Sequence, residues 1–220
     1  MSAVNIVEKK PAAMRRKRAD KPVRKAVMYG AEAQTQILDA IDELFYLEGA
    51  RAVGVDAVVK RAGVNKMSLY RQFESKDALL LHYLTRRQER FWNYFGESLA
   101  KHPGKPREQL CQFFIDVAER AQRTGYRGCP FVNLAIEFPD SAHPVRRVVA
   151  DNKDELMARL LALATQAGAR DPQALANGMA LLIEGAYTAT QTYAPGHALI
   201  AAIPQVASSM IEAACGKSPA

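Results

Sequence analysis

From Ala31 onward, apolar side chains recur three and four positions apart, the spacing that places them on one face of an α-helix. Glycine and proline separate the successive apolar segments. These breaks predict helices over about 31–48, 56–62, 66–73, 76–100, 106–123, 130–138, 144–167, 172–193 and 195–214. Pro204, inside the last segment, predicts a kink or a shifted start there. No segment alternates as a β-strand does, so the pattern predicts an all-α chain of about nine helices.

The segment 56–80 carries the most specific local pattern. It predicts two short helices joined by a tight turn and followed at once by a third helix. Gly63 is the residue most able to adopt a positive φ in that turn, and Asn65 stands where its side chain can cap the next helix. That helix has an apolar base of Leu69 and Phe73, and its predicted outward positions are Lys66, Ser68, Tyr70 and Arg71. A polar, cationic helix on an apolar base suits the major groove of DNA.

The net charge of +7 is concentrated at the N-terminus. Residues 1–30 contain nine Lys or Arg against two acidic residues, so the remaining 190 residues are balanced. This segment lacks apolar periodicity, which predicts a disordered basic arm. Such an arm enters the minor groove beside a bound site, adds unspecific attraction to DNA, or acts only as a solubilising tail.

The cysteines, the apolar stretches and the lack of metal or catalytic motifs limit the class of protein to which the chain can belong. The three cysteines have no short-range pairing, which argues against a disulfide framework and for a reducing compartment. No uninterrupted apolar stretch approaches the ~20 residues that span a bilayer. We expect a soluble, cytoplasmic protein with no membrane partner. No metal-ligand spacing, phosphate loop or nucleophile elbow appears, so no metal, cofactor or enzymatic activity is expected, although a site assembled from distant residues stays open.

One part of the chain resembles a known family. The N-terminal DNA-binding domain of the TetR family of transcriptional regulators is similar to the string AGVNKMSLYRQFESKDALL, which follows a helix ending in LEGARAVGV. The resemblance covers about residues 32–80, and it is specific because its parts occur in order at fixed spacing. It implies a helix-turn-helix DNA-binding domain at 31–75 and a larger helical ligand-binding and dimerisation domain at 76–220. The segment GCPFVNLA, at 128–135, is similar to a stretch in one branch of the family.

The resemblance also implies which residues face DNA. On the recognition helix they are Lys66, Met67, Ser68, Tyr70 and Arg71. Tyr70 and Lys76 match family positions that commonly touch phosphates. By its chemistry Arg71 can present a bidentate fork to guanine, and the cations able to neutralise phosphates are Lys60, Lys66 and Lys76. Each lysine could instead be an ordinary solvated charge, and Tyr70 could be anchored in the core.

Two positions depart from the family pattern. Gly54, just before the second helix, stands where the family often has a Ser or Thr that bonds a phosphate. Met67 stands where the family often has a small residue, and it either touches a thymine methyl or packs internally. By resemblance, the last two helices pair with their copies, and the resulting homodimer reads a near-palindromic double-stranded DNA operator.

A regulator also needs an input, and the apolar C-terminal body suits a pocket for a small apolar or aromatic inducer. The aromatic candidates to line it are Trp92, Phe95, Phe114, Phe131 and Tyr187. An aromatic residue at helical spacing is more often part of the core, so that alternative stays open. Two carboxylates lie in apolar runs, Glu137 and Glu184. Each orients a ligand, bridges an interface or faces outward.

Cys129 follows a glycine and precedes Pro130, which places it near a helix N-terminus. The helix dipole, helped by Arg127, would lower the pKa of its thiol and suit a redox or electrophile sensor. The alternative is a buried, inert cysteine.

These expectations describe a ligand-responsive transcriptional regulator that binds its operator as a dimer and is released by a small-molecule inducer. Repression is the sign that the family resemblance implies. Two alternatives are a redox-sensing regulator that uses Cys129 and an architectural DNA-binding protein without an inducer. The large apolar body argues against the architectural alternative, because such a protein would not need it.

Overall fold

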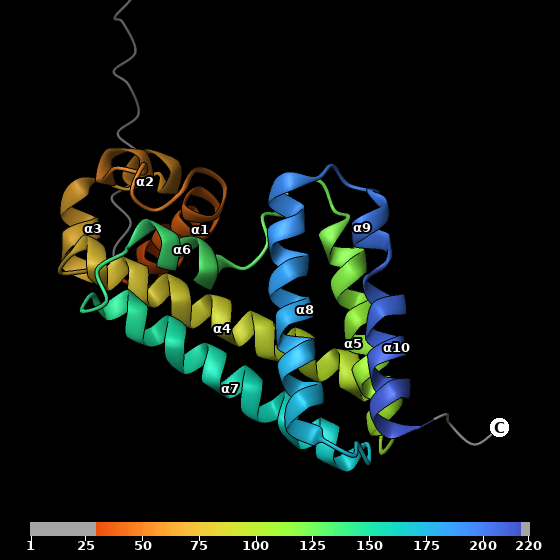
Figure 1. Cartoon of the computed structure of the whole chain (residues 1–220). Coiled ribbons are helices and arrows are strands. Elements are labelled where there is room, and N and C mark those ends of the chain that lie inside the picture. The colour runs from red at the N-terminus through yellow and green to blue at the C-terminus, as the bar shows by residue number, and fades with distance from the viewer. Residues whose placement is uncertain (1–29, 217–220) are drawn as a thin grey trace, which may run out of the picture.

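The computed structural model describes residues 30–216, which form ten helices and no strand (Figure 1). The helices are α1 (Ala31–Glu48), α2 (Val55–Ala62), α3 (Lys66–Gln72), α4 (Lys76–Ala100), α5 (Pro106–Ala121), α6 (Pro130–Glu137), α7 (Pro144–Gln166), α8 (Pro172–Thr192), α9 (Ala198–Ala201) and α10 (Ile203–Cys215). The predicted all-α fold is confirmed, and α9 is only four residues long. The predicted basic arm, apart from Gly30, lies outside the described residues.

Proline stands in the first turn of five helices, α5, α6, α7, α8 and α10. A missing N–H is harmless there, because first-turn amides have no acceptor within the helix. Pro204 accordingly begins α10 and separates it from α9. This confirms the shifted start predicted within the last segment.

The stretch Ala198–Cys215 is apolar over a length that the sequence expectation had excluded. It has a mean hydropathy of 1.5 over 18 residues, and by length and composition alone it is able to cross a membrane. It is not one continuous helix, because α9 ends before Ala202 and α10 begins after it. In the folded chain α10 packs against α5 and α8. Part of its apolar surface is therefore used in the helical body.

The N-terminal domain, formed by α1, α2 and α3, follows the predicted turn and cap chemistry. Gly63 ends α2 in the left-handed region, with φ of 70°. The side chain of Asn65 caps α3 by accepting a hydrogen bond from the Ser68 N–H at 2.8 Å. The Ser75 hydroxyl caps α4 in the same way. The core of this domain includes the fully buried side chains of Ile37, Ile41, Val58, Leu69 and Phe73.

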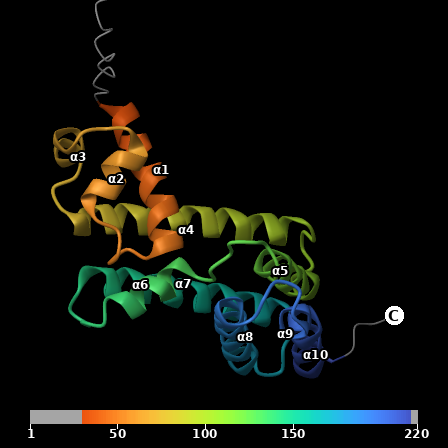
Figure 2. The same cartoon turned by 90° about the horizontal axis from the view of Figure 1, so that it is seen from above.

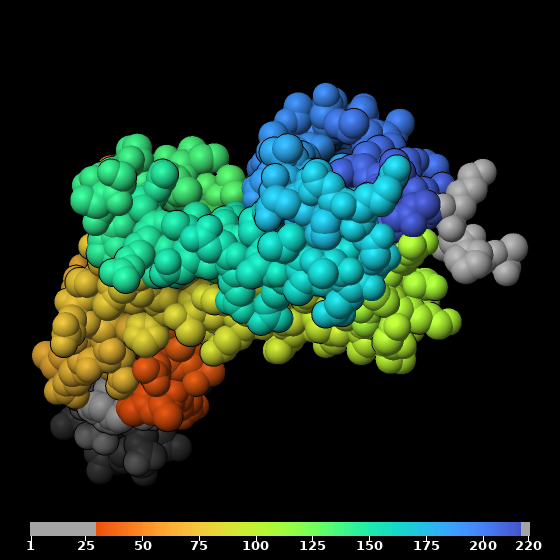
Figure 3. All heavy atoms as spheres, turned by 60° about the horizontal axis from the view of Figure 1, so that its bottom comes forward, coloured from red at the N-terminus to blue at the C-terminus, as the bar shows by residue number. Residues whose placement is uncertain are grey.

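The long helix α4 joins the N-terminal domain to the rest of the protein (Figure 2). Near its start, Tyr83 packs edge to face against Phe45 of α1, with ring centroids 5.7 Å apart. Near its end, Phe95 packs against Phe113 of α5 at 4.8 Å. The N-terminal domain forms a lobe at one end of the molecule (Figure 3). α4 therefore packs on both the N-terminal domain and the rest of the helical body.

Candidate nucleic-acid interface and ligand cavity

The outer face of α3 presents polar and apolar side chains to solvent. Lys66, Met67, Tyr70 and Arg71 are all exposed, and the exposed fractions of Met67 and Tyr70 are 64% and 55%. These positions fall on one side of the helix, because residues 66 and 70, and likewise 67 and 71, are four apart and share a face. A large exposed Met and Tyr on a short surface helix leave apolar area without an internal partner, as a surface that contacts DNA does.

Ser68 does not belong to this face, and the prediction that it points outward is wrong. Its residue is only 5% exposed. Successive side chains of a helix turn by about 100°, so position 68 lies on the side of buried Leu69 rather than beside positions 66, 67 and 70. Its N–H bonds to Asn65 instead.

The predicted phosphate contacts differ in their surroundings. Lys60 is exposed. The Lys66 ammonium pairs with Asp56 at 2.7 Å, and this hydrogen bond raises the pKa of Lys66. The Lys76 ammonium donates to the Val53 carbonyl at 2.8 Å and so ties the start of α4 to the loop before α2. In the free protein Lys76 thus positions the domain, and its phosphate contact remains a prediction.

The N-terminal domain as a whole is not basic. Residues 31–75 contain five Lys or Arg against seven Asp or Glu. Attraction to DNA depends on phosphates being neutralised by cations. Any such attraction therefore depends on the placement of single cations, such as the exposed Lys60, Lys66 and Arg71, rather than on the net charge of this domain.

Glu137, at the end of α6, bridges the N-terminal domain and the body. Its carboxylate accepts a hydrogen bond from the Arg51 N–H at 2.6 Å, and its carbonyl accepts one from the Arg51 guanidinium at 3.0 Å. One carboxylate oxygen lies where a side chain on Gly49 would begin, 3.3 Å from that Cβ position. Of the roles left open for Glu137, these contacts favour the interface bridge over ligand binding.

A second bridge joins the end of α1 to the loop before α6. The Tyr46 hydroxyl donates to the Gly128 carbonyl at 3.1 Å and accepts from the Arg127 N–H at 2.7 Å. The Arg127 guanidinium donates to the Tyr46 carbonyl at 2.9 Å and also to the Leu47 carbonyl. Gly128 has a φ of +67°, and a Cβ there would lie 2.7 Å from the Tyr187 carbonyl oxygen, so the loop fits against α8 only with glycine.

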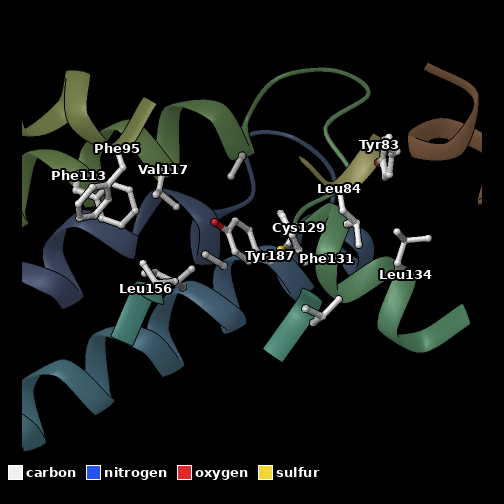
Figure 4. Packing of buried hydrophobic residues seen from close by; sticks show 14 of the residues in the cluster. Tyr83, Leu84, Phe95, Phe113, Val117, Cys129, Phe131, Leu134, Leu156 and Tyr187 are labelled. Atoms are coloured by element: carbon white, nitrogen blue, oxygen red, sulfur yellow. The ribbon is translucent and has the colours of Figure 1, made fainter. Parts of the chain in front are cut away.

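Beneath this loop lies a cavity of about 180 Å³. Its walls come from α1, α4, α5, α6, α7, α8 and the loop, and its aromatic lining consists of Tyr46, Phe91, Tyr94, Tyr126, Phe131 and Tyr187. Tyr187, Cys129 and Phe131 lie close together there (Figure 4). Of the predicted ligand residues, the structure brings Phe131 and Tyr187 to this cavity.

The other predicted ligand residues lie elsewhere. Phe95 packs against Phe113 in the core (Figure 4). Phe114 is buried against Phe113, and Trp92 packs edge to face on Phe95 at 5.9 Å. None of the three lines the cavity. Phe95 and Phe114 instead fill the α4–α5 core. Glu184 does not line this cavity; it pairs with Lys153 at 2.5 Å and lines a second pocket that also includes Lys153.

Sequence reasoning missed the cationic part of the cavity lining. It consists of Arg87, Arg90, Arg120 and Lys153. These residues come from three helices that are far apart in sequence, so no local motif marks them. A signal existed only for the aromatic residues, through their apolar spacing.

Cys129 is buried, and the expectation of a lowered thiol pKa is wrong. Burial raises the pKa of the Cys129 thiol, and the Lys153 ammonium, 3.6 Å from the sulfur, only partly opposes this effect. The stabilisation of a thiolate by the helix N-terminus does not outweigh the cost of removing the thiolate from water. The thiol therefore has the character of a core cysteine rather than a reactive one.

Two family models match the chain. The family model described as "Bacterial regulatory proteins, tetR family" matches residues 37–83, and the model "Tetracyclin repressor-like, C-terminal domain" matches residues 104–206. A putative TetR transcriptional regulator from Streptomyces avermitilis is 33% identical, with a TM-score of 0.72 over 83% of this chain and 97% of the other. The chain belongs to the TetR family of transcriptional regulators.

Further similarities agree with the family. A TetR-family transcriptional regulator from Streptomyces coelicolor is 26% identical, with a TM-score of 0.80 over 84% of this chain and 97% of that chain. Two uncharacterised helix-turn-helix transcriptional regulators of Mycobacterium tuberculosis strains are 36% identical over 58 residues, which is 26% of this chain and 29% of each relative. TetR-family proteins are DNA-binding regulators, generally dimeric, and not enzymes. The family predicted from the recognition segment is confirmed.

Proposed function

We propose that this TetR-family protein is a ligand-responsive repressor that binds a near-palindromic DNA operator as a homodimer. A small molecule in the cavity releases it. The observation that carries the proposal is the place of the cavity: Tyr46 of the DNA-binding domain forms part of its wall. A ligand there touches the element that the body must hold in place for DNA binding. The DNA target also implies action in the cytoplasm.

On DNA, α3 enters the major groove, and the exposed residues contact either bases or phosphates. Arg71 reads guanine through its guanidinium, and Met67 contacts a thymine methyl. Tyr70 and Lys60 contact phosphates, which fix the register without reading sequence. Lys66 must exchange Asp56 for a phosphate, so its contribution to affinity is reduced by the ion pair that it gives up.

The dimer uses the last long helices of the body. Three large apolar side chains there are exposed, Leu181, Leu199 and Val206, with exposed fractions of 72%, 51% and 42%. Leu181 lies on α8, and the other two lie on α9 and α10, which form the apolar stretch noted above. Burying such a surface against a second copy removes apolar area from water and places two α3 helices on one duplex.

The ligand changes the equilibrium between a DNA-competent and a released conformation. It can do so only by its difference in affinity for the two states. The bridges made by Tyr46 and Glu137 are the contacts through which the body senses the position of α1. A ligand that displaces Tyr46 lowers the population of the DNA-competent state.

Selection from a pool of random double-stranded DNA tests this proposal. We expect enrichment of an inverted repeat, bound by two chains per site. Arg71→Ala should lose the enrichment, whereas Arg123→Ala, an exposed control in the body, should keep it. Retention of all sequences alike would contradict the proposal and favour an architectural DNA-binding protein.

A further inference from the structure

The charge of the cavity is one-sided. Four cationic side chains line it and no carboxylate does, and the cations are Arg87, Arg90, Arg120 and Lys153. Lys153 is neutralised by Glu184. Arg120 forms no ion pair within residues 30–216; its guanidinium instead lies over the Tyr94 ring at 3.9 Å and near the Tyr126 ring at 5.9 Å. A guanidinium held between aromatic faces without a carboxylate keeps its full charge for a ligand.

The lining also holds a buried hydrogen-bond donor without an acceptor. Asn152 is only 4% exposed and lines the cavity, and its amide nitrogen, Nδ2, has no hydrogen-bond partner within the described part of the chain. A buried donor without an acceptor is costly, so this group calls for one from a ligand. Burial raises the pKa of Tyr126 and of Tyr187. Their phenols therefore stay protonated and can donate.

The size and the walls of the cavity limit the body of the ligand. A cavity of about 150 Å³ is known to hold a benzene molecule, so the volume of about 180 Å³ has room for one aromatic ring with a small substituent. Phe91, Phe131 and Tyr187 supply the aromatic faces for such a ring.

We propose that the inducer is a small organic anion: a single-ring aromatic carboxylate whose charge is held by Arg120 and Asn152. This inference rests on the proposed ligand-gated function and names its ligand class. A neutral ring of the same size would leave the Arg120 charge and the Asn152 amide without an acceptor. Charge-assisted hydrogen bonds are about twice as strong as neutral ones, so the carboxylate decides the affinity.

The same charge explains how the ligand would act on DNA binding. Asp42 of α1 is 5% exposed, and its carboxylate pairs with Arg90 at 2.6 Å and Arg87 at 3.3 Å. Both arginines also line the cavity. Arg86, which does not line it, pairs with Asp42 at the longer distance of 3.6 Å. An anion in the cavity competes with Asp42 for the two shared guanidiniums and so loosens α1, and with it α3, from α4.

Calorimetric titration with matched probes tests the ligand class. The probes are benzoate, salicylate and cinnamate against benzamide, salicylamide and cinnamamide, at constant ionic strength. We expect at least one carboxylate to bind about tenfold or more tightly than its amide. Arg120→Gln should remove this preference. Arg123→Gln, an exposed residue outside the lining that also removes one positive charge, should keep it.

The competition with Asp42 can be tested with a variant that should strengthen carboxylate binding, whereas Arg120→Gln should weaken it. Asp42→Asn removes the competing charge with little change in shape, so the carboxylate should bind more tightly while affinity for operator DNA falls. An unchanged helical circular dichroism spectrum and a cooperative thermal transition show that each variant is folded. Weaker carboxylate binding by folded Asp42→Asn would contradict the competition.

The outcomes separate this inference from the proposed function. Amides that bind as tightly as the carboxylates, or no carboxylate binding at millimolar concentration, would overturn the anionic ligand. If a neutral compound occupied the cavity and released DNA, the ligand-gated function would stand but the anionic ligand class would not. If a carboxylate bound with the predicted preference but left DNA affinity unchanged, the ligand class would stand and the gating would fail.

Discussion

The recognition face and the cavity are built in different ways. The face of α3 comes from one continuous segment, with Lys66, Met67, Tyr70 and Arg71 on a single helix. The cavity takes its walls from six helices and a loop, and every wall also packs against its neighbours in the fold. Residues of the face can therefore change without disturbing the fold, whereas residues of the cavity connect the ligand, the core and the DNA-binding domain.

The largest effect on the fold is expected where the loop that covers the cavity lies close to α8. Gly128→Ala should lower the free energy of unfolding by about 2–4 kcal/mol, because its Cβ would meet the Tyr187 carbonyl and its φ is positive. Gly125→Ala is the matched control, with a φ of +76° and open space around its Cβ, and should cost about 1 kcal/mol. Chemical denaturation measures the free energy of unfolding of both variants. Equal losses would show that the loop moves away from the Tyr187 carbonyl without a further loss of stability.

At the recognition face we expect loss of affinity without loss of stability. Arg71→Ala should weaken operator binding by about 1–3 kcal/mol and relax the preference at one base pair of each half-site. The thermal midpoint should not change, because Arg71 is exposed. Fluorescence anisotropy with the selected site and its single-base variants checks this. Equal weakening on all sequences would reassign Arg71 to a phosphate.

Because residues 31–75 carry more acidic than basic side chains, we expect the basic arm to contribute to DNA affinity. Deleting residues 1–29 should lower operator affinity about tenfold at moderate salt. The slope of log affinity against log salt should fall by about one unit for each phosphate that the arm had neutralised. A truncated protein with unchanged affinity and slope would make the arm a solubilising tail only.

A smaller effect is expected at Gly54, the N-cap of α2. Its backbone is extended, no side chain caps the helix, and a Cβ there meets nothing within 4 Å. Gly54→Ser should stabilise α2 by a few tenths of a kcal/mol. It should also tighten DNA binding about twofold through a phosphate contact. Gly54→Ala has the same Cβ but no hydroxyl, so it should not tighten binding.

The local features of the fold could be predicted from the sequence because they depend on neighbouring residues. Gly63, Asn65 and Ser75 act through turns and caps within three positions. Prolines marked the helix starts for the same reason. The exception at Ser68 is also local: its polarity suggests an outward position, whereas the turn of about 100° per residue places it on the inward side of α3.

The composition of the ligand site could not be predicted in this way. Arg120, Arg87 and Lys153 lie on three helices, and only tertiary packing brings them to one cavity. Phe114 and Phe131 have similar apolar surroundings in the sequence, yet one fills the core and the other lines the cavity. For Cys129, burial rather than its place at a helix start sets the direction of the pKa shift. Each of these outcomes depends on contacts between distant segments.

Reciprocal linkage between the two sites is the most direct test of coupling. The DNA affinity of the protein is measured by anisotropy with and without the most tightly bound panel carboxylate, and the affinity for that carboxylate is measured with and without operator DNA. Ligand gating through the cavity predicts that each ligand weakens the other by the same factor, at least about fivefold. A factor of one in both directions would contradict it.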